Sequence, residues 1–142
     1  KSKLLLCGDG VLKNKIVDLA EQMKILEDII FLGNVENVND YYMAMDRFVF
    51  PSIFEGLGIV TIEAQTTGLP CFCSSGVPKE AKVTDQCFFL PLDDADVWAQ
   101  QITKDYGERI DRSDAVRECG YDITSTVQLL EDLYTRMSER NA

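Results

Sequence analysis

The sequence predicts an α/β fold: a doubly wound parallel sheet with helices on both faces, a Rossmann-like three-layer α/β/α arrangement. Five short apolar runs, rich in aromatic and β-branched residues, alternate with segments of helical periodicity. Each of the first four runs is followed by a loop that contains glycine or serine. With 142 residues and 46% hydrophobic content, the chain is large enough for one domain with its own core. We therefore expect residues 1–142 to form a single domain.

The first apolar run, residues 3–7, is expected to be a buried strand, and the apolar stripe after it predicts a helix over residues 11–24. Gly8-Asp9-Gly10 joins the two elements. A dinucleotide-binding fingerprint would have a third glycine where Lys13 stands. The turn therefore fits two interpretations: a loop that faces a ligand, or a tight turn that needs only the φ freedom of glycine.

The other strands are expected at residues 28–32, 47–50, 69–73 and 86–90. Gly33-Asn34 closes the second strand, Pro51-Ser52 the third and Ser74-Ser75-Gly76 the fourth. By itself, Gly33-Asn34 is an ordinary turn sequence. Ligands of open α/β sheets bind outside the carboxyl ends of the strands, so these loops and the first glycine turn are expected to line one cleft.

The junction after the third strand carries the strongest chemical signal. We expect Glu55-Gly-Leu-Gly to open a helix whose apolar face is Leu57, Val60 and Ala64, with Gly68 ending it. Glycines at 56 and 58 leave room for a phosphate or diphosphate at the unpaired amides near Gly58 and Ile59. Glu63 lies one turn further along, where a carboxylate can accept hydrogen bonds from a ribose diol.

A simpler interpretation of the two glutamates is that the helix dipole favours acidic residues near a helix start. A related question concerns Asp94-Ala95-Asp96, because a D-x-D motif can bind a metal ion and a nucleotide. Here the motif precedes a helical segment, and an acidic helix start explains it better. Further helices are expected after Asn37 or Asn39, at 77–80, at 113–119 with Ser113 as a possible cap, and from Asp122 or Thr124 onward.

Composition excludes several classes of function. The net charge of −10 disfavours nucleic acid and anionic membrane surfaces as partners. Without histidine, the segment holds neither a Ser-His-Asp nor a Cys-His catalytic pair. The five cysteines form no C-x-x-C motif, so a reducing cytoplasm and no metal site are expected. Four of them, Cys7, Cys71, Cys73 and Cys87, lie in strand-like runs and are expected to be small buried hydrophobes. No apolar run is long enough for a membrane span, and no signal peptide is visible.

Taken together, Pro51-Ser52-x-x-Glu55-Gly56-x-Gly58-x4-Glu63 after an apolar strand resembles the E-x7-E signature of family-4 retaining glycosyltransferases of the GT-B fold. Phe31-Leu32-Gly33, Gly68-x-Pro70 and Gly120-Tyr121-Asp122 also match that pattern, from about Leu4 to Tyr134. The resemblance covers the carboxyl-terminal, donor-binding half of such an enzyme. The family's upstream Arg and Lys pair lies outside the chain, and Leu57 replaces a frequent phenylalanine.

The resemblance implies roles for individual residues. Glu55 would be the catalytic residue that contacts the transferred sugar, and Glu63 would hold the ribose. The donor, expected to be a UDP-sugar bound without a metal or other cofactor, would be contacted by the following residues: Gly8, Gly10, Gly33, Asn34, Ser52, Gly56, Leu57, Gly58, Ile59 and Glu63. The acceptor, a glycan or lipid-linked sugar of surface polysaccharide biosynthesis, would bind to an amino-terminal domain that is absent from this chain.

The first residue is not methionine and the chain opens directly on a strand, as expected for a piece of a longer protein. The segment alone is therefore expected to bind nucleotide at best, without turnover. The longer protein is expected to be cytoplasmic, with the inner face of the membrane as one location that this allows. Two alternatives stay open: a GT-B nucleotide-sugar epimerase, and a stand-alone nucleotide-binding Rossmann-like module.

Overall fold

A computed structural model describes residues 2–140, and in it the chain divides into two compact units. One unit comprises the residues up to Val38, the other those from Asn39 onward. Each unit is described by itself below. The prediction that residues 1–142 form one domain stays a prediction.

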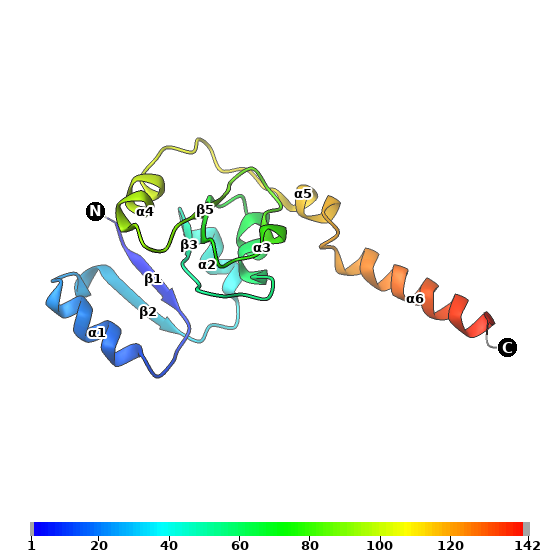
Figure 1. The fold of residues 1–142 in the computed structure, drawn as a ribbon, viewed down its shortest axis with the longest axis horizontal. Coiled ribbons are helices and arrows are strands. Elements are labelled where there is room, and N and C mark those ends of the chain that lie inside the picture. The colour runs from blue at the N-terminus through cyan, green and yellow to red at the C-terminus, as the bar shows by residue number, and fades with distance from the viewer. Residues whose placement is uncertain (1, 141–142) are drawn as a thin grey trace. The chain divides into compact units, whose positions relative to one another are not determined.

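The amino-terminal unit contains one parallel pair of strands with its connecting helix (Figure 1). β1 (Leu4–Cys7) pairs with β2 (Ile29–Gly33), and between them come α1 (Lys13–Gln22) and the 3₁₀ turn η1 (Leu26–Asp28). The register shifts by one residue after Leu6, so that Cys7 lies opposite Gly33. The strand, turn and helix order predicted for this part is confirmed, but Cys7 is exposed rather than buried.

The second unit is built on three parallel strands in the order β3-β4-β5. These are Phe48–Phe50, Cys71–Ser74 and Cys87–Leu90. The helical elements are α2 (Val38–Ala44), α3 (Ile59–Thr66), η2 (Lys79–Ala81), α4 (Ala95–Ile102), α5 (Ser113–Glu118) and α6 (Ile123–Arg140). Every strand pair is parallel, which confirms the α/β class.

Among residues 2–140, the strands are hydrogen-bonded as β1-β2 in the first unit and as β3-β4-β5 in the second. A strand can be predicted from its own residues, whereas the strand that pairs with it depends on contacts between residues far apart in the chain. β3 has only three residues, and its central Val49 is 37% exposed.

The three-stranded sheet separates two apolar layers, because successive side chains of a strand point to opposite faces. On one face, Phe72 packs with Leu90 and with Trp98 of α4. On the other, Cys71 and Cys73 contact Thr61 of α3. The three-layer arrangement is thus present around β3–β5. The thiols of Cys71, Cys73 and Cys87 are buried as predicted, and burial raises the pKa of Cys71.

The last helix, α6, differs from the others because all of its 18 residues are exposed. Asp122 starts it, accepting hydrogen bonds from the amide and the hydroxyl of Ser125. Ser113, in contrast, does not cap α5: it is the first residue of that helix, and Arg112 occupies the N-cap position without a side-chain cap hydrogen bond. No helix within residues 2–140 is long and apolar enough to cross a membrane.

Candidate functional site

Helix α3 begins at Ile59, not at Glu55, and its start depends on the backbone of Gly58. Gly58 is the N-cap residue with φ 76°, in the left-handed region that a side chain disfavours. It is buried, and a Cβ built there would lie 3.1 Å from Val77 Cγ1. The predicted phosphate-binding turn is therefore a left-handed glycine followed by a helix, with Glu55, Gly56 and Leu57 in the preceding loop.

The first turn of α3 leaves backbone donors available. The Thr61 amide donates to the Gly58 carbonyl at 2.9 Å. Within the described part of the chain, the amides of Ile59 and Val60 have no acceptor. Gly56 is exposed, and a Cβ built on it would meet nothing within 4 Å. An anion can approach these amides, which also lie at the positive end of the helix dipole.

Glu55 is held at the end of the loop that follows β3. The Ser52 hydroxyl donates to Glu55 Oε1 at 2.7 Å, and the Glu55 side chain is half-buried. Between these two residues, Ile53 and Phe54 are each 84% exposed. The structure therefore brings Ser52 and Glu55 together, beside two apolar side chains that face solvent.

Glu63 lies in the second turn of α3, as predicted, and it has a partner that the sequence analysis did not identify. The Tyr42 hydroxyl donates to Glu63 Oε2 at 3.2 Å. Tyr42 comes from α2 and is only 2% exposed. Its local pattern indicates only a core aromatic, and no short-range signal reveals a contact with a residue 21 positions later in the sequence.

The loop after β4 lies against the loop after β3. The Ser74 hydroxyl donates to the Ser52 carbonyl, and the Gly76 amide donates back to Ser74 Oγ at 3.1 Å. A side chain at Gly76 would collide with the backbone of Ile53. Two of the loops expected at the carboxyl end of the sheet are thus adjacent.

The remaining predicted donor residues belong to the amino-terminal unit. The Gly8 amide donates to the Gly33 carbonyl at 2.7 Å, so these two glycines are neighbours. Both have positive φ, 120° and 66°, and neither would meet an atom within 4 Å of an added Cβ. Gly10 and Asn34 follow them in exposed positions. The convergence of these four residues with those of the second unit stays a prediction.

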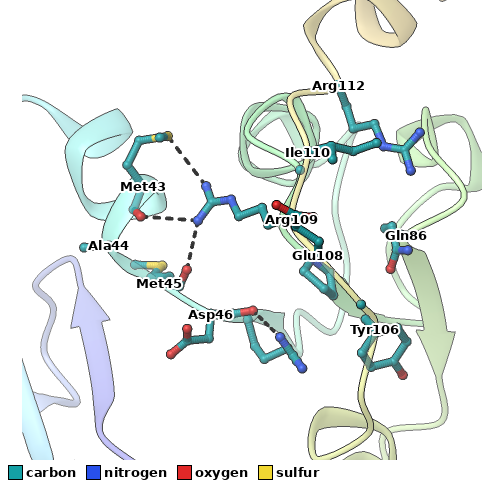
Figure 2. Close-up of a pocket in the computed structure, with 14 residues that line it drawn as sticks. Met43, Ala44, Met45, Asp46, Gln86, Tyr106, Glu108, Arg109, Ile110 and Arg112 are labelled. Carbon is teal, nitrogen blue, oxygen red and sulfur yellow. Dashed lines mark hydrogen bonds between the residues drawn. The ribbon is translucent and has the colours of Figure 1, made fainter.

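A pocket of about 260 Å³ lies at the opposite end of the three-stranded sheet (Figure 2). Its lining residues precede the three strands or belong to the segment after α4, and none is a predicted donor residue. Arg109 dominates this pocket: its guanidinium donates to the carbonyls of Thr67 (2.6 Å), Met45 (3.0 Å) and Tyr42 (2.9 Å). Arg47 is similarly bound, to the carbonyls of Ile102 and Lys104.

The guanidinium groups of Arg109 and Arg47 therefore donate hydrogen bonds to backbone carbonyls of the protein. Among residues 2–140, the buried side-chain N or O atom left without a hydrogen bond is Gln86 Oε1, which is an acceptor and would repel a phosphate. We conclude that the pocket is a structural junction, and that the loops at the carboxyl ends of the strands form the better candidate site.

The D-x-D motif forms a helix cap. Asp94 Oδ1 accepts the amide of Val97 at 3.0 Å, as the acidic helix start predicts. Residues 2–140 contain no group of three or more His, Cys, Asp or Glu side chains placed to hold a metal ion.

Comparisons with known proteins identify the family. The family described as "Glycosyl transferases group 1" matches residues 1–106. The putative glycosyltransferase EpsF of Bacillus subtilis (strain 168) is 32% identical over 148 residues, which cover 98% of this chain and 38% of EpsF. An Escherichia coli enzyme, UDP-Gal:alpha-D-GlcNAc-diphosphoundecaprenol alpha-1,3-galactosyltransferase, is 27% identical over 96% of this chain and 37% of its own length.

Solved structures agree on the fold. Sucrose-phosphate synthase from Thermosynechococcus elongatus matches with a TM-score of 0.79 at 23% identity, over 97% of this chain and 39% of that one. Anabaena HepE, solved in complex with UDP, matches with a TM-score of 0.76 at 17% identity, over 95% and 41%. The chain thus spans about two-fifths of the length of the proteins it matches. On this evidence the chain belongs to the group 1 glycosyl transferases, the family-4 enzymes of the GT-B fold that its motifs resemble.

Proposed function

We propose that this chain is the donor-binding part of a retaining glycosyltransferase that transfers a sugar from a UDP-sugar to a glycan or lipid-linked acceptor in surface polysaccharide biosynthesis. The observation that carries the proposal is the start of α3. Unpaired amides at Ile59 and Val60 follow a left-handed glycine, with Glu55 before them and Glu63 one turn after Ile59. From Glu55 through the amides to Glu63, this order of groups matches the order of sugar, diphosphate and ribose in a nucleotide sugar.

The activities and ligands of relatives support the choice of donor and acceptor. The Escherichia coli relative uses UDP-galactose and a diphosphoundecaprenol-linked acceptor, and HepE was solved with UDP. The acceptor would bind to the portion of a longer enzyme that this chain does not include. Glu55, beside the transferred sugar, would stabilise positive charge that develops as the bond to the diphosphate breaks. Glu63 would accept hydrogen bonds from the ribose equally before and during transfer.

Calorimetry on the 142-residue chain tests the binding half of this proposal. We expect uridine diphosphate to bind weakly, with a Kd on the order of 1 mM or below. Because the amides at the start of α3 replace a metal in neutralising the diphosphate, EDTA should leave the affinity unchanged. Absence of binding, or binding that requires added manganese, would contradict the proposal.

Steady-state kinetics on the longer enzyme test the two roles. Glu63→Ala should raise the donor KM more than it lowers kcat, at a cost of about 1.5–3 kcal/mol, the range for a hydrogen bond to a charged group. Glu55→Gln keeps the shape of the side chain and removes its charge, so kcat should fall while affinity for the nucleoside diphosphate stays near that of the wild type. The reverse pattern would show that the roles are wrongly assigned.

A further inference from the structure

We infer that Tyr42 is a positioning residue for Glu63 and that, through Glu63, it determines the preference of this site for ribose over deoxyribose. The inference rests on the proposed function, because it takes Glu63 as the carboxylate that meets the ribose. Its own evidence is the hydrogen bond of 3.2 Å from the Tyr42 hydroxyl to Glu63 Oε2.

The Tyr42 hydroxyl is placed by a rigid environment. The side chain is 2% exposed, and its ring meets Phe48 of β3 edge to face, with centroids 5.7 Å apart and planes at 84°. The Tyr42 carbonyl accepts a hydrogen bond from Arg109 at 2.9 Å, so the backbone of the same residue is also held. The donor atom is therefore fixed before any ligand arrives.

Glu63 needs such a partner because its own side chain is flexible. It has three rotatable bonds, and its side chain is only half-buried. A hydrogen bond from Tyr42 to Oε2 selects one orientation of the carboxylate, which reduces the rotamer freedom that binding would otherwise remove. An ionised carboxylate has about four acceptor positions, so Oε1 and the second lone pair of Oε2 stay available for a ribose diol.

The neighbouring tyrosine provides a matched control. Tyr41 lies in the same helix and is partly exposed. The hydrogen bond to Glu63 comes from Tyr42, not from Tyr41. Tyr42→Phe and Tyr41→Phe each remove one hydroxyl oxygen and leave the ring in place. Any general effect of losing a tyrosine hydroxyl from α2 should therefore appear in both variants.

The experiment compares the binding of uridine diphosphate and 2′-deoxyuridine diphosphate to the 142-residue chain by calorimetry. The wild type should prefer the ribonucleotide roughly tenfold or more, as expected for a hydrogen bond to a charged group. Tyr42→Phe should reduce that preference by about threefold or more, and Tyr41→Phe should leave it unchanged. In a Glu63→Ala background, Tyr42→Phe should have no further effect on the preference.

Each contrary result has a distinct meaning. If the wild type binds neither nucleotide, the proposed function fails and this inference fails with it. If the wild type prefers ribose, Glu63→Ala removes the preference and a folded Tyr42→Phe retains it, the proposed function stands and the role of Tyr42 is wrong. A loss of affinity for both nucleotides by the same factor in Tyr42→Phe would show a merely structural residue.

A second measurement applies even if Tyr42→Phe does not fold. In the wild type labelled with ¹³C-tyrosine, the ring signals of Tyr42 should move on addition of uridine diphosphate, and should move less with the 2′-deoxy compound. Equal movement with both nucleotides would overturn the inference.

Discussion

The two ends of the three-stranded sheet use hydrogen-bond donors in opposite ways. At the amino ends of β3–β5, Arg109 donates to backbone carbonyls at the ends of α2 and α3. At the carboxyl ends, the amides of Ile59 and Val60 have no acceptor among residues 2–140. The amino end contains a pocket, yet the Arg109 guanidinium that lines it already donates its N–H groups to carbonyl oxygens and to Met43 Sδ. The comparison teaches that free donors, rather than a concave shape, identify the end that can bind a diphosphate.

The largest effect is expected at Arg109. Arg109→Met would leave carbonyls at the ends of two helices without their charged partner, because helix C-terminal carbonyls have no intrahelical donor. We expect the free energy of unfolding to fall by about 3 kcal/mol. Arg112→Met is the control from the same pocket: it removes one ion pair of 3.3 Å to an Asp85 side chain that is 69% exposed. That change should cost less than about 1 kcal/mol.

Urea denaturation of the two variants measures the difference. Equal destabilisation by both substitutions would show that Arg109 is not the junction between α2 and α3. If Arg109→Met is fully folded under the conditions of the binding experiment and still binds the nucleotide more weakly, that result would indicate a ligand at the amino end.

A smaller effect is expected at Gly58. Gly58→Val places a branched side chain at φ 76° and within reach of Val77, which should cost about 1–3 kcal/mol of stability. The tolerance expected of a valine at an ordinary helix start does not apply, because the conformation here is left-handed. Gly56→Ala serves as the control: its Cβ would meet no atom, so stability should change little.

Both glycine variants should weaken binding of uridine diphosphate, since each adds a side chain beside the free amides. Melting curves and calorimetry separate the two quantities. Unchanged affinity in both folded variants would place the diphosphate elsewhere.

The smallest effect is expected at the start of α6, far along the chain from either end of the sheet. The Ser125 hydroxyl and amide lower the pKa of the Asp122 carboxyl below its ordinary 3.8. Because the folded-state pKa is lowered, the cap stabilises the helix above about pH 3.8 and is lost as pH falls through the lower, folded-state pKa. Carbon chemical shifts of residues 123–126 should report this fraying on acidification. Asp122→Asn keeps an acceptor and should remove the pH dependence; a pH dependence that persists in this variant would contradict the assignment.

Local patterns predicted the elements well, since all five strands and the caps at Asp94 and Asp122 depend on neighbouring residues. The face of α3 was predicted less well. Leu57 precedes the helix, and the residues buried in α3 include Thr61 and Gln65, which an apolar stripe does not contain.

Gln65 shows why such residues escape prediction. It is fully buried; its amide group donates to Ala81 O at 2.7 Å and accepts from the amides of Val83 and Thr84. These partners lie 16 to 19 residues away, so no local pattern contains them. The same holds for Tyr42 with Glu63, and for the pairing of strands into two sheets. For the candidate site, the sequence identified Glu55, Gly58 and Glu63, whereas the left-handed conformation of Gly58 became visible only in the structure.

The central claim is that a nucleoside diphosphate binds at the carboxyl ends of β3–β5, at the start of α3. Titration of the ¹⁵N-labelled chain with uridine diphosphate, followed by NMR, tests this claim most directly. The account predicts that the amide signals of Gly58, Ile59, Val60 and Gly76 move and that those of Arg109 and Arg112 do not. Movement confined to residues 43–47 and 106–112, with the start of α3 unaffected, would contradict it.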